Sequence, residues 1–367
     1  MRRLLLPILF GLNLVVMLNF VAATNAQELE LSWQMQPNLC DASLRGLCVV
    51  DEKVVWASGS GGTILKTKNG GESWKDVSLP GGKELDFRDI HAFDSKNAVV
   101  INAGQPALFY RTGDGGITWE KVFHHPNETA FFDSVAAIDS THLIAMSDPI
   151  DDRILLVEST DSGESWTELE ANRRPLKLAG EAGFAASGSN MITDPEAGTI
   201  YLALGSAEEG TKHKLSRIVY STDAAQTWNP INCPMKRNPS SGIFSLSYLP
   251  NQRLVAVGGD YRKPEEKVGI ISIAKFTGDT VQCDVPETTP GGFRSGVTFT
   301  RIGNEQILVV TVGTNGGDYS QDSGETWRPF STENFHAVKS TGSGTIWASG
   351  GNGRIAKLLI SEPPTWE

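Results

Sequence analysis

The sequence has no excess of basic residues, only four cysteines and only one long apolar run. Its 367 residues include 32 Lys and Arg against 43 Asp and Glu, which gives a formal net charge of −11 at pH 7. Because a protein that binds a nucleic acid backbone needs the opposite sign of charge, we expect no nucleic acid partner. The patterns Gly-x-Ser-x-Gly and His-Glu-x-x-His are absent, which removes two common hydrolase classes.

The one long apolar run lies near the first residue. It covers residues 4–23, follows Arg2-Arg3 and is followed by small residues at 24–26. This order predicts a secretory signal peptide over 1–26, a single mature domain over 27–367 and a secreted or periplasmic location. The alternative is an uncleaved anchor, since the run approaches the ~20 residues that span a bilayer. After cleavage we expect no stable membrane insertion.

An eight-residue pattern, Ser/Thr-x-Asp-x-Gly-x-Ser/Thr-Trp, occurs five times. Its acidic or amide residues are Asn69, Asp114, Asp161, Asp223 and Asp322, and its aromatic residues are Trp74, Trp119, Trp166, Trp228 and Trp327. Such a side chain folds back onto the N–H groups of a β-turn, and the Trp packs across the base of the hairpin. We therefore predict a structural role. The alternative is that these carboxylates bind a ligand or metal.

A second periodicity gives the number of repeats. Apolar runs that end in a turn residue occur seven times, at 54–59, 98–104, 142–148, 199–205, 253–258, 306–313 and 345–350. Each fits one strand of a unit of four short strands, and no helical periodicity persists between them. The sequence predicts an all-β fold, a seven-bladed β-propeller of four-stranded antiparallel blades. Residues 29–35, with Trp33, should supply the outer strand of the last blade and close the ring.

The repeats identify a family. The phrases Gly-Gly-Thr-Ile-Leu-Lys-Thr with Asn-Gly-Gly-Glu-Ser-Trp, and Trp-Ala-Ser-Gly-Gly-Asn-Gly-Arg-Ile at 347–355, resemble the BNR/Asp-box propellers. Within these they are similar to the photosystem II stability/assembly factor family and its non-photosynthetic bacterial relatives. The resemblance covers about residues 29–360. It implies a propeller that binds other proteins during assembly of a membrane complex, without catalysis.

The cysteines fit this blade arrangement. An exported chain meets an oxidising compartment, where an even number of cysteines usually forms disulfides. We predict a bridge between Cys40 and Cys48, which would fasten the closing strand to the first blade, and another between Cys233 and Cys283, which would join the fourth and fifth blades. No cysteine pair has the Cys-x-x-Cys spacing, and the glycine-rich stretch at 351–356 precedes no helix. We expect neither a metal nor a cofactor.

The inner strands should begin on the face of the propeller that lies opposite the eight-residue turns. The turns after the second strands should lie on that same face. The starts of the inner strands are Arg45, Arg88, Asp133, Glu181, Ser241, Arg294 and His336, and the neighbouring turns add Asp148, Asp260 and Tyr261. A ring of positively and negatively charged side chains around a concave mouth predicts a binding site for a protein or a glycan. We expect the chain to be a monomer. The alternative is that these charges pair with one another and only tie the blades together.

Two further chemistries remain open on this face. Asp148, Asp151 and Asp152 could hold Ca²⁺, although a solvated acidic loop explains them as well. The sialidases, which share the repeat, need three arginines, a tyrosine and acidic groups. The residues that could supply this set are Arg45, Arg88, Arg294, Asp133, Glu181 and Tyr261. The Arg-Ile-Pro phrase of that family is missing, so a non-catalytic scaffold is the leading hypothesis and a sialidase-like glycan hydrolase the alternative.

Overall fold

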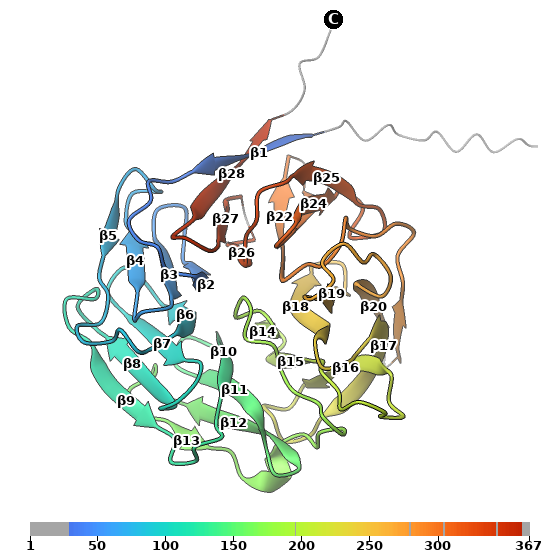
Figure 1. The fold of residues 1–367 in the computed structure, drawn as a ribbon, viewed down its shortest axis with the longest axis horizontal. Helices are drawn as coiled ribbons and strands as arrows, with labels where there is room; N and C mark the ends of the chain where they lie inside the picture. The colour runs from blue at the N-terminus through green and yellow to red at the C-terminus, as the bar shows by residue number, and fades with distance from the viewer. Residues whose placement is uncertain (1–28, 195, 279, 304, 343, 362–367) are drawn as a thin grey trace, which may run out of the picture.

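The computed structural model describes residues 29–194, 196–278, 280–303, 305–342 and 344–361. Within these ranges the chain forms seven separate four-stranded sheets, arranged as blades around a central axis (Figure 1). The predicted all-β, seven-bladed propeller is therefore confirmed. The predicted signal peptide, 1–26, lies outside the described residues. In the described part of the chain, no helix has the length and apolar character needed to cross a membrane.

Each blade is an antiparallel sheet whose strands follow one another from the centre outwards. Blade 1 contains β2 (Leu44–Val49), β3 (Val55–Gly59), β4 (Ile64–Thr67) and β5 (Trp74–Asp76). Blade 2 contains β6 (Phe87–Ala92), β7 (Ala98–Asn102), β8 (Leu108–Thr112) and β9 (Glu120–His124). Blade 3 contains β10 (Phe132–Ala137), β11 (Leu143–Ile150), β12 (Arg153–Ser159) and β13 (Thr167–Glu168).

The remaining blades repeat this order. Blade 4 contains β14 (Met191–Asp194), β15 (Thr199–Leu204), β16 (Leu215–Ser221) and β17 (Asn229–Lys236). Blade 5 contains β18 (Ser241–Leu249), β19 (Arg253–Asp260), β20 (Ile271–Thr277) and β21 (Thr280–Asp284). Blade 6 contains β22 (Gly296–Ile302), β23 (Gln306–Gly313), β24 (Gly316–Ser320) and β25 (Arg328–Ser331). A short 3₁₀ helix, η1 (Ala171–Arg173), precedes blade 4.

The last blade is built from both parts of the chain. It contains β26 (Ala337–Ser340), β27 (Ile346–Ser349) and β28 (Ile355–Ser361), and its outer strand is β1 (Glu30–Met35). β1 runs antiparallel to β28, as the top of Figure 1 shows, and the register places Trp33 opposite Leu358. The predicted closure by an N-terminal strand is thus confirmed, and it joins the two ends of the ring through backbone hydrogen bonds.

The core lies between neighbouring blades. The second strands are apolar on both faces, because each is covered by a blade on either side, and β3, β7 and β27 are buried throughout. One cluster joins Val99 and Ile101 of blade 2 to Leu143 and Ala145 of blade 3. Continuous apolar runs in place of strict alternation are what these sandwiched strands require.

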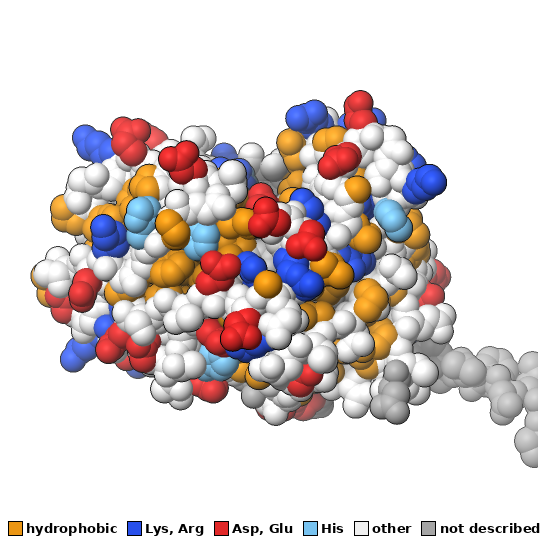
Figure 2. Space-filling model, turned by 90° about the horizontal axis from the view of Figure 1, so that it is seen from below, with side chains coloured by type: hydrophobic (Ala, Val, Ile, Leu, Met, Phe, Trp, Pro, Cys, Tyr) orange, Lys and Arg blue, Asp and Glu red, His pale blue; other side chains and the backbone are white. Residues whose placement is uncertain are grey.

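The eight-residue turns use their polar side chains locally. In blade 2, Asp114 accepts hydrogen bonds from the backbone N–H of Thr118 at 2.9 Å and from its hydroxyl at 2.6 Å. Trp119 then packs edge-on against Trp56, with ring centroids 6.4 Å apart. The carboxylates are therefore occupied within their own turns. Figure 2, which views the edge of the ring, shows acidic and basic side chains side by side over the outer surface.

All four cysteines are free thiols in the structure, so neither predicted disulfide is present. Cys40 and Cys48 pack into different clusters, and Cys48 Sγ lies 3.7 Å from the carbonyl oxygen of Ala92 in the next blade. Each of these two thiols has its own packing environment, which argues against that bridge. The Sγ atoms of Cys233 and Cys283 lie 3.0 Å apart, between blades 4 and 5, so their pairing stays a prediction.

Candidate functional site

Four inner strands carry one extra, unpaired residue near their first residues. These residues are Arg45 in β2, Arg88 in β6, Asp133 in β10 and Phe244 in β18. Such a β-bulge bends the strand and turns the extra side chain out of the regular alternation. Because the inner strands begin at the central axis, the bulges of different blades aim different side chains at a common region.

Three of these four side chains meet in a cavity at the mouth of the central channel. The cavity has a volume of about 410 Å³. It is lined by Arg45, Arg88, Phe184, Ala185, Ala186, Phe244, Tyr261, Phe293, Ser295, Thr314 and His336. These residues come from blades 1, 2, 5, 6 and 7 and from the segment that precedes β14, so the site is shared by most of the ring. We call it the mouth cavity.

One wall of the mouth cavity is aromatic. The rings of Phe184 and Phe244 are stacked with centroids 3.9 Å apart and planes 11° from parallel. Phe293 meets Phe244 edge-on at 4.8 Å, and the Tyr261 ring is 45% exposed beside them. Aromatic surface that is open on one side, with a hydroxyl at its edge, suits a ligand that is partly apolar.

Another part of the cavity lining is cationic. Arg45 Nη1 donates to the carbonyl oxygen of Ala186 at 3.4 Å, and within the described ranges Arg45 forms no salt bridge. Arg88 donates from Nε to Asp86 Oδ2 at 2.7 Å. Burial, and then the nearby charge of Arg88, lower the pKa of Arg45. Burial and the same two arginines lower the pKa of His336 to about 4, so this imidazole is neutral at pH 7.

A segment between blades 3 and 4 crosses the mouth. Residues 182–190, which we call the plug segment, lead into β14, and Figure 1 shows this green part of the chain reaching toward the centre of the ring. Ser187 Oγ donates to the carbonyl oxygen of Ser295 at 2.7 Å, and Ser189 Oγ lies 2.6 Å from Ser245 Oγ. The plug segment is therefore fastened to blades 5 and 6, and Phe184, Ala185 and Ala186 form part of the cavity wall.

Two predicted site residues are used in buried ion pairs. Glu181 accepts from Arg217 Nη2 at 2.6 Å and from Arg237 Nη1 at 3.2 Å. Arg294 donates from Nε to Asp318 Oδ2 at 2.7 Å, and both side chains are almost fully buried. Neither pair lines the mouth cavity. For these two positions the structural alternative holds, because their charges connect loops and strands.

The predicted turn residues divide in the same way. Asp260 is only 8% exposed and accepts from the backbone N–H of Arg262 at 3.0 Å, so it serves its own turn, whereas Tyr261 faces the cavity. Asp151 and Asp152 are exposed, whereas Asp148 is partly buried and accepts a hydrogen bond from the backbone N–H of Gly183 at 3.1 Å. Among the described residues no group of three or more His, Cys, Asp or Glu side chains converges as a metal site, so that loop does not form the predicted acidic cluster.

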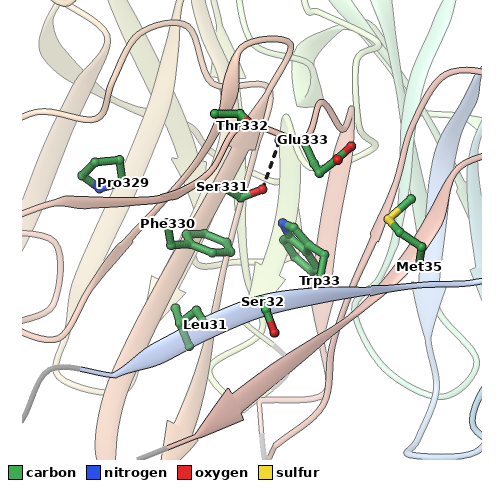
Figure 3. A pocket seen from close by; sticks show the side chains of 9 residues that line it. All are labelled: Leu31, Ser32, Trp33, Met35, Pro329, Phe330, Ser331, Thr332 and Glu333. Atoms are coloured by element: carbon green, nitrogen blue, oxygen red, sulfur yellow. Dashed lines mark hydrogen bonds between the residues drawn. The ribbon is translucent and has the colours of Figure 1, made fainter. Parts of the chain in front are cut away.

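A second cavity, of about 530 Å³, lies at the seam where the ring closes (Figure 3). It is lined by Leu31, Ser32, Trp33, Met35, Pro329, Phe330, Ser331, Thr332 and Glu333. Trp33 lies 5.6 Å from Phe330 between ring centroids, on the outer strands of blades 7 and 6. This groove contains none of the predicted site residues and no basic group, so we do not treat it as the main site.

Hydrolytic chemistry of the sialidase type does not assemble here. Of the three candidate arginines, Arg294 is held by Asp318, and of the candidate acids, Glu181 is held between two arginines. Arg45, Arg88 and Tyr261 remain in the mouth cavity. Within the described ranges, Asp86 is the one acidic residue that forms a salt bridge with Arg45 or Arg88, and it does so with Arg88. Among the residues that the structure describes, the lining of the mouth cavity contains no pair of carboxylates placed on opposite sides of a bond.

The aromatic wall and the plug segment were not predicted. A signal exists in the repeat itself: the inner strands begin with an apolar residue, a variable residue and then a small or acidic one, as in Phe87-Arg88-Asp89 and Ile243-Phe244-Ser245. Alignment of the blades on this triplet identifies Phe244, and not Ser241, as the residue of blade 5 that faces the mouth.

Comparison with known proteins agrees with this architecture. Residues 24–148 match the family model described as "Photosynthesis system II assembly factor YCF48". A 63-residue stretch is 38% identical to the chloroplastic photosystem II stability/assembly factor HCF136 of Oryza sativa subsp. japonica and 35% identical to that of Arabidopsis thaliana. Each match covers 16% of this chain and 15% of the relative, so the chain matches only a small part of the length of either protein.

Solved structures share the fold over most of the chain. YCF48 from Cyanidioschyzon merolae has a TM-score of 0.62 at 17% identity and covers 89% of this chain and 98% of its own. A structure titled "YCF48 bound to D1 peptide" has a TM-score of 0.60 at 16% identity, over 90% and 95%. A GH74 xyloglucanase from Xanthomonas campestris has a TM-score of 0.56 at 15% sequence identity, and the match covers 89% of this chain and 53% of the xyloglucanase chain. The chain is thus a seven-bladed propeller that resembles the photosystem II assembly factors, in sequence over its first third and in fold over about nine-tenths of its length.

Proposed function

We propose that the chain is an exported, non-catalytic scaffold that binds an extended segment of a protein partner in the mouth cavity. The observation that carries this proposal is the pairing of an open aromatic wall, with Phe244 and Tyr261, and a cationic wall, with Arg45 and Arg88. A peptide offers both apolar side chains and carboxylate or carbonyl oxygens to such a site. The relative whose structure contains a D1 peptide supports a protein as the kind of partner.

A glycan is the second candidate. Aromatic faces also stack against sugar rings, and the GH74 neighbours carry propellers of similar fold. The peptide is favoured because Arg45 has a guanidinium without a carboxylate partner within the described chain, and a neutral glycan offers no charge to it.

Site-specific photo-crosslinking tests the choice of face and of partner. A photoreactive phenylalanine analogue replaces Tyr261 at the mouth cavity or, as the matched control, Ile117 in an eight-residue turn, which is 79% exposed. After irradiation in the native envelope, we expect protein adducts from position 261 that disappear when Arg45 is changed to Glu. Adducts from position 117 alone would contradict the assignment of the face.

An activity screen separates the scaffold from the hydrolase. The purified chain is incubated with a panel of chromogenic glycosides, and we expect no turnover. Release of chromophore that is lost in Arg88→Ala but kept in the Ile117 variant would replace the scaffold proposal with a glycan-cleaving enzyme.

A further inference from the structure

Two carboxylates approach one another beneath the plug segment, outside the mouth cavity. Asp133 is the extra residue of the bulge in β10, and Asp148 lies near the end of β11, the next strand of blade 3. Asp148 Oδ1 accepts a hydrogen bond from the backbone N–H of Gly183, in the plug segment, at 3.1 Å. A Cβ placed on Gly183 would lie 2.4 Å from Asp133 Oδ2, so both carboxylates lie against this residue of the plug segment. Burial and then the charge of Asp148 raise the pKa of Asp133.

In the described structure, the carboxylate of Asp133 is buried without a hydrogen-bond donor beside it. Its side chain is 1% exposed, and neither carboxylate oxygen has a hydrogen-bond partner among the residues that the structure describes. The nearest basic influence comes from Arg88, whose Nε already donates to Asp86 Oδ2 at 2.7 Å. An ionised carboxylate in such a place is costly unless a positive charge joins it.

A third polar side chain shares this place and points independently to a ligand. Asn190, at the other end of the plug segment, is fully buried, and in the described structure both its amide oxygen and its nitrogen lack partners. A Cβ placed on Gly183 would lie 2.4 Å from Asp133 Oδ2 and 2.9 Å from Asn190 Nδ2. Both side chains therefore meet over Gly183, and rotation of the Asn190 amide plane can present its oxygen there.

We propose that Asp133, Asp148 and Asn190 form a binding site for Ca²⁺ that fastens the plug segment to blade 3. Ca²⁺ prefers several oxygen ligands in a flexible geometry, and two carboxylates with one amide oxygen supply up to five, leaving the rest to water. Mg²⁺ fits less well because it demands regular octahedral coordination. The ion supplies the positive charge that the two carboxylates lack and gives Asn190 a partner.

The site has a consequence for the mouth cavity. Residues of the plug segment at 183 and 190 flank the stretch that carries Phe184, Ala185 and Ala186, which line that cavity. The ion would bind Asn190 at one end of this stretch directly and Gly183 at the other end through Asp148, and it would so restrain the aromatic wall. This role does not depend on which partner the mouth cavity receives.

Calorimetric titration and thermal unfolding of the chain after EGTA treatment test the proposal. We expect CaCl₂ to bind at one ion per chain and to raise the unfolding midpoint, MgCl₂ and NaCl at equal ionic strength to have little effect, and hydrogen exchange to slow in residues 182–190. Asp133→Asn should weaken Ca²⁺ binding at least tenfold. Because it removes an uncompensated buried charge, this variant should unfold at the same or a higher temperature than the wild type in calcium-free buffer.

Asp151→Asn is the control, since Asp151 is an exposed acid in the turn after Asp148 and should leave calcium binding unchanged. Loss of binding in Asp151→Asn, or a calcium response that survives in Asp133→Asn, would overturn the site. A midpoint that rises on acidification but ignores CaCl₂ would show that a proton stabilises the pair, and would also overturn it.

Discussion

Aspartates at the two ends of the blades lie in opposite environments. In the eight-residue turns the carboxylates are exposed and accept several hydrogen bonds, led by the hydroxyls of Thr118 for Asp114 and Thr227 for Asp223, and these bonds lower both pKa values to about 2. Near the central channel, burial raises the pKa of Asp148 to about 6 and that of Asp89 to about 7. The same side chain is a turn-forming acceptor at one end and a buried acid at the other.

The difference teaches where this propeller buries acidic groups at a cost in free energy. A turn carboxylate finds its donors within four residues of the chain, so each blade satisfies it alone. A channel carboxylate depends on neighbouring blades. Asp89 Oδ2 accepts from the backbone N–H of Val135 in blade 3 at 2.8 Å, and the charge of Lys339 in blade 7 lowers the pKa of Asp89 against the larger effect of burial. The channel end therefore requires the complete ring, and functional sites often contain buried groups with shifted pKa values of this kind.

The largest expected effect is on the pH dependence of stability. A carboxyl whose pKa is raised by folding stabilises the protein below its unfolded pKa, near 3.9, and this stability is lost as the pH rises through the folded value. For Asp148 and Asp89 the loss should extend over pH 4 to 7, at up to about 1.4 kcal/mol per pH unit for each group, on the order of several kcal/mol in total. Chemical unfolding in calcium-free buffer measures it.

The turn carboxylates should give the opposite slope. Because folding lowers the pKa of Asp114 and Asp223, their stabilisation is present above pH 4 and is lost as the pH falls toward 2. Stability should therefore pass through a maximum near pH 4 to 5. Asp89→Asn should reduce the slope of the free energy of unfolding against pH between pH 4 and 7, and should leave the slope below pH 4 unchanged. An unchanged slope between pH 4 and 7 in this variant would refute the assignment to Asp89.

A matched pair of substitutions in blade 6 gives the next largest effect. Asp318→Asn leaves the Arg294 guanidinium buried without its counter-charge, which typically costs about 3–5 kcal/mol. Asp322→Asn, four residues later in the eight-residue turn, should cost far less, because the amide oxygen still accepts from the backbone N–H of Thr326 at 2.9 Å. Guanidinium unfolding curves with a common slope compare the two, and equal midpoints would contradict the contrast between the ends.

Two glycines give a smaller contrast. A Cβ at Gly183 would lie 2.4 Å from Asp133 Oδ2, whereas one at Gly113, in the turn of blade 2, would meet nothing closer than 3.7 Å. Gly183→Ala should therefore cost about 1–3 kcal/mol through overpacking. Gly113→Ala should be neutral or stabilise by about 0.4–1 kcal/mol through the unfolded state. Thermal unfolding of both variants decides, and a harmless Gly183→Ala would show that the plug segment moves freely.

Repetition made the fold predictable. The strand runs, the number of blades and the closure with Trp33 opposite Leu358 follow from patterns that recur seven times, and such local regularity survives the tertiary context. The predicted disulfide between Cys40 and Cys48 is not formed in the structure, where the Cys48 thiol faces Ala92 of the next blade. Proximity in sequence does not determine the direction of a side chain.

The candidate site was predictable only in part. Arg88, Tyr261 and His336 line the mouth cavity, as the starts of strands and turns predicted, because their place depends on the repeat. Glu181 was misread, since its partners Arg217 and Arg237 lie 36 and 56 residues away and no repeat encodes that meeting. The plug segment belongs to one blade alone, and a unique insertion leaves no periodic signal.

The smallest expected effect comes from replacing an aspartate of an eight-residue turn by asparagine, and one turn of the chain already contains asparagine at this position. Blade 1 has Asn69 where blade 4 has Asp223, and both Oδ1 atoms accept from a backbone N–H four residues on, at 3.0 and 2.9 Å. Asn69 donates from Nδ2 to Ser73 Oγ at 3.0 Å, whereas Asp223 accepts from Thr227 Oγ1, so a hydroxyl can serve either side chain by rotating.

Asp223→Asn should therefore change the free energy of unfolding by about 0.5 kcal/mol or less at pH 7. At pH 3 the variant should match or exceed the wild type, because an amide loses nothing on acidification. Urea unfolding at both pH values measures this, and a large loss at pH 7 would mean that the carboxylate does more than hold its own turn.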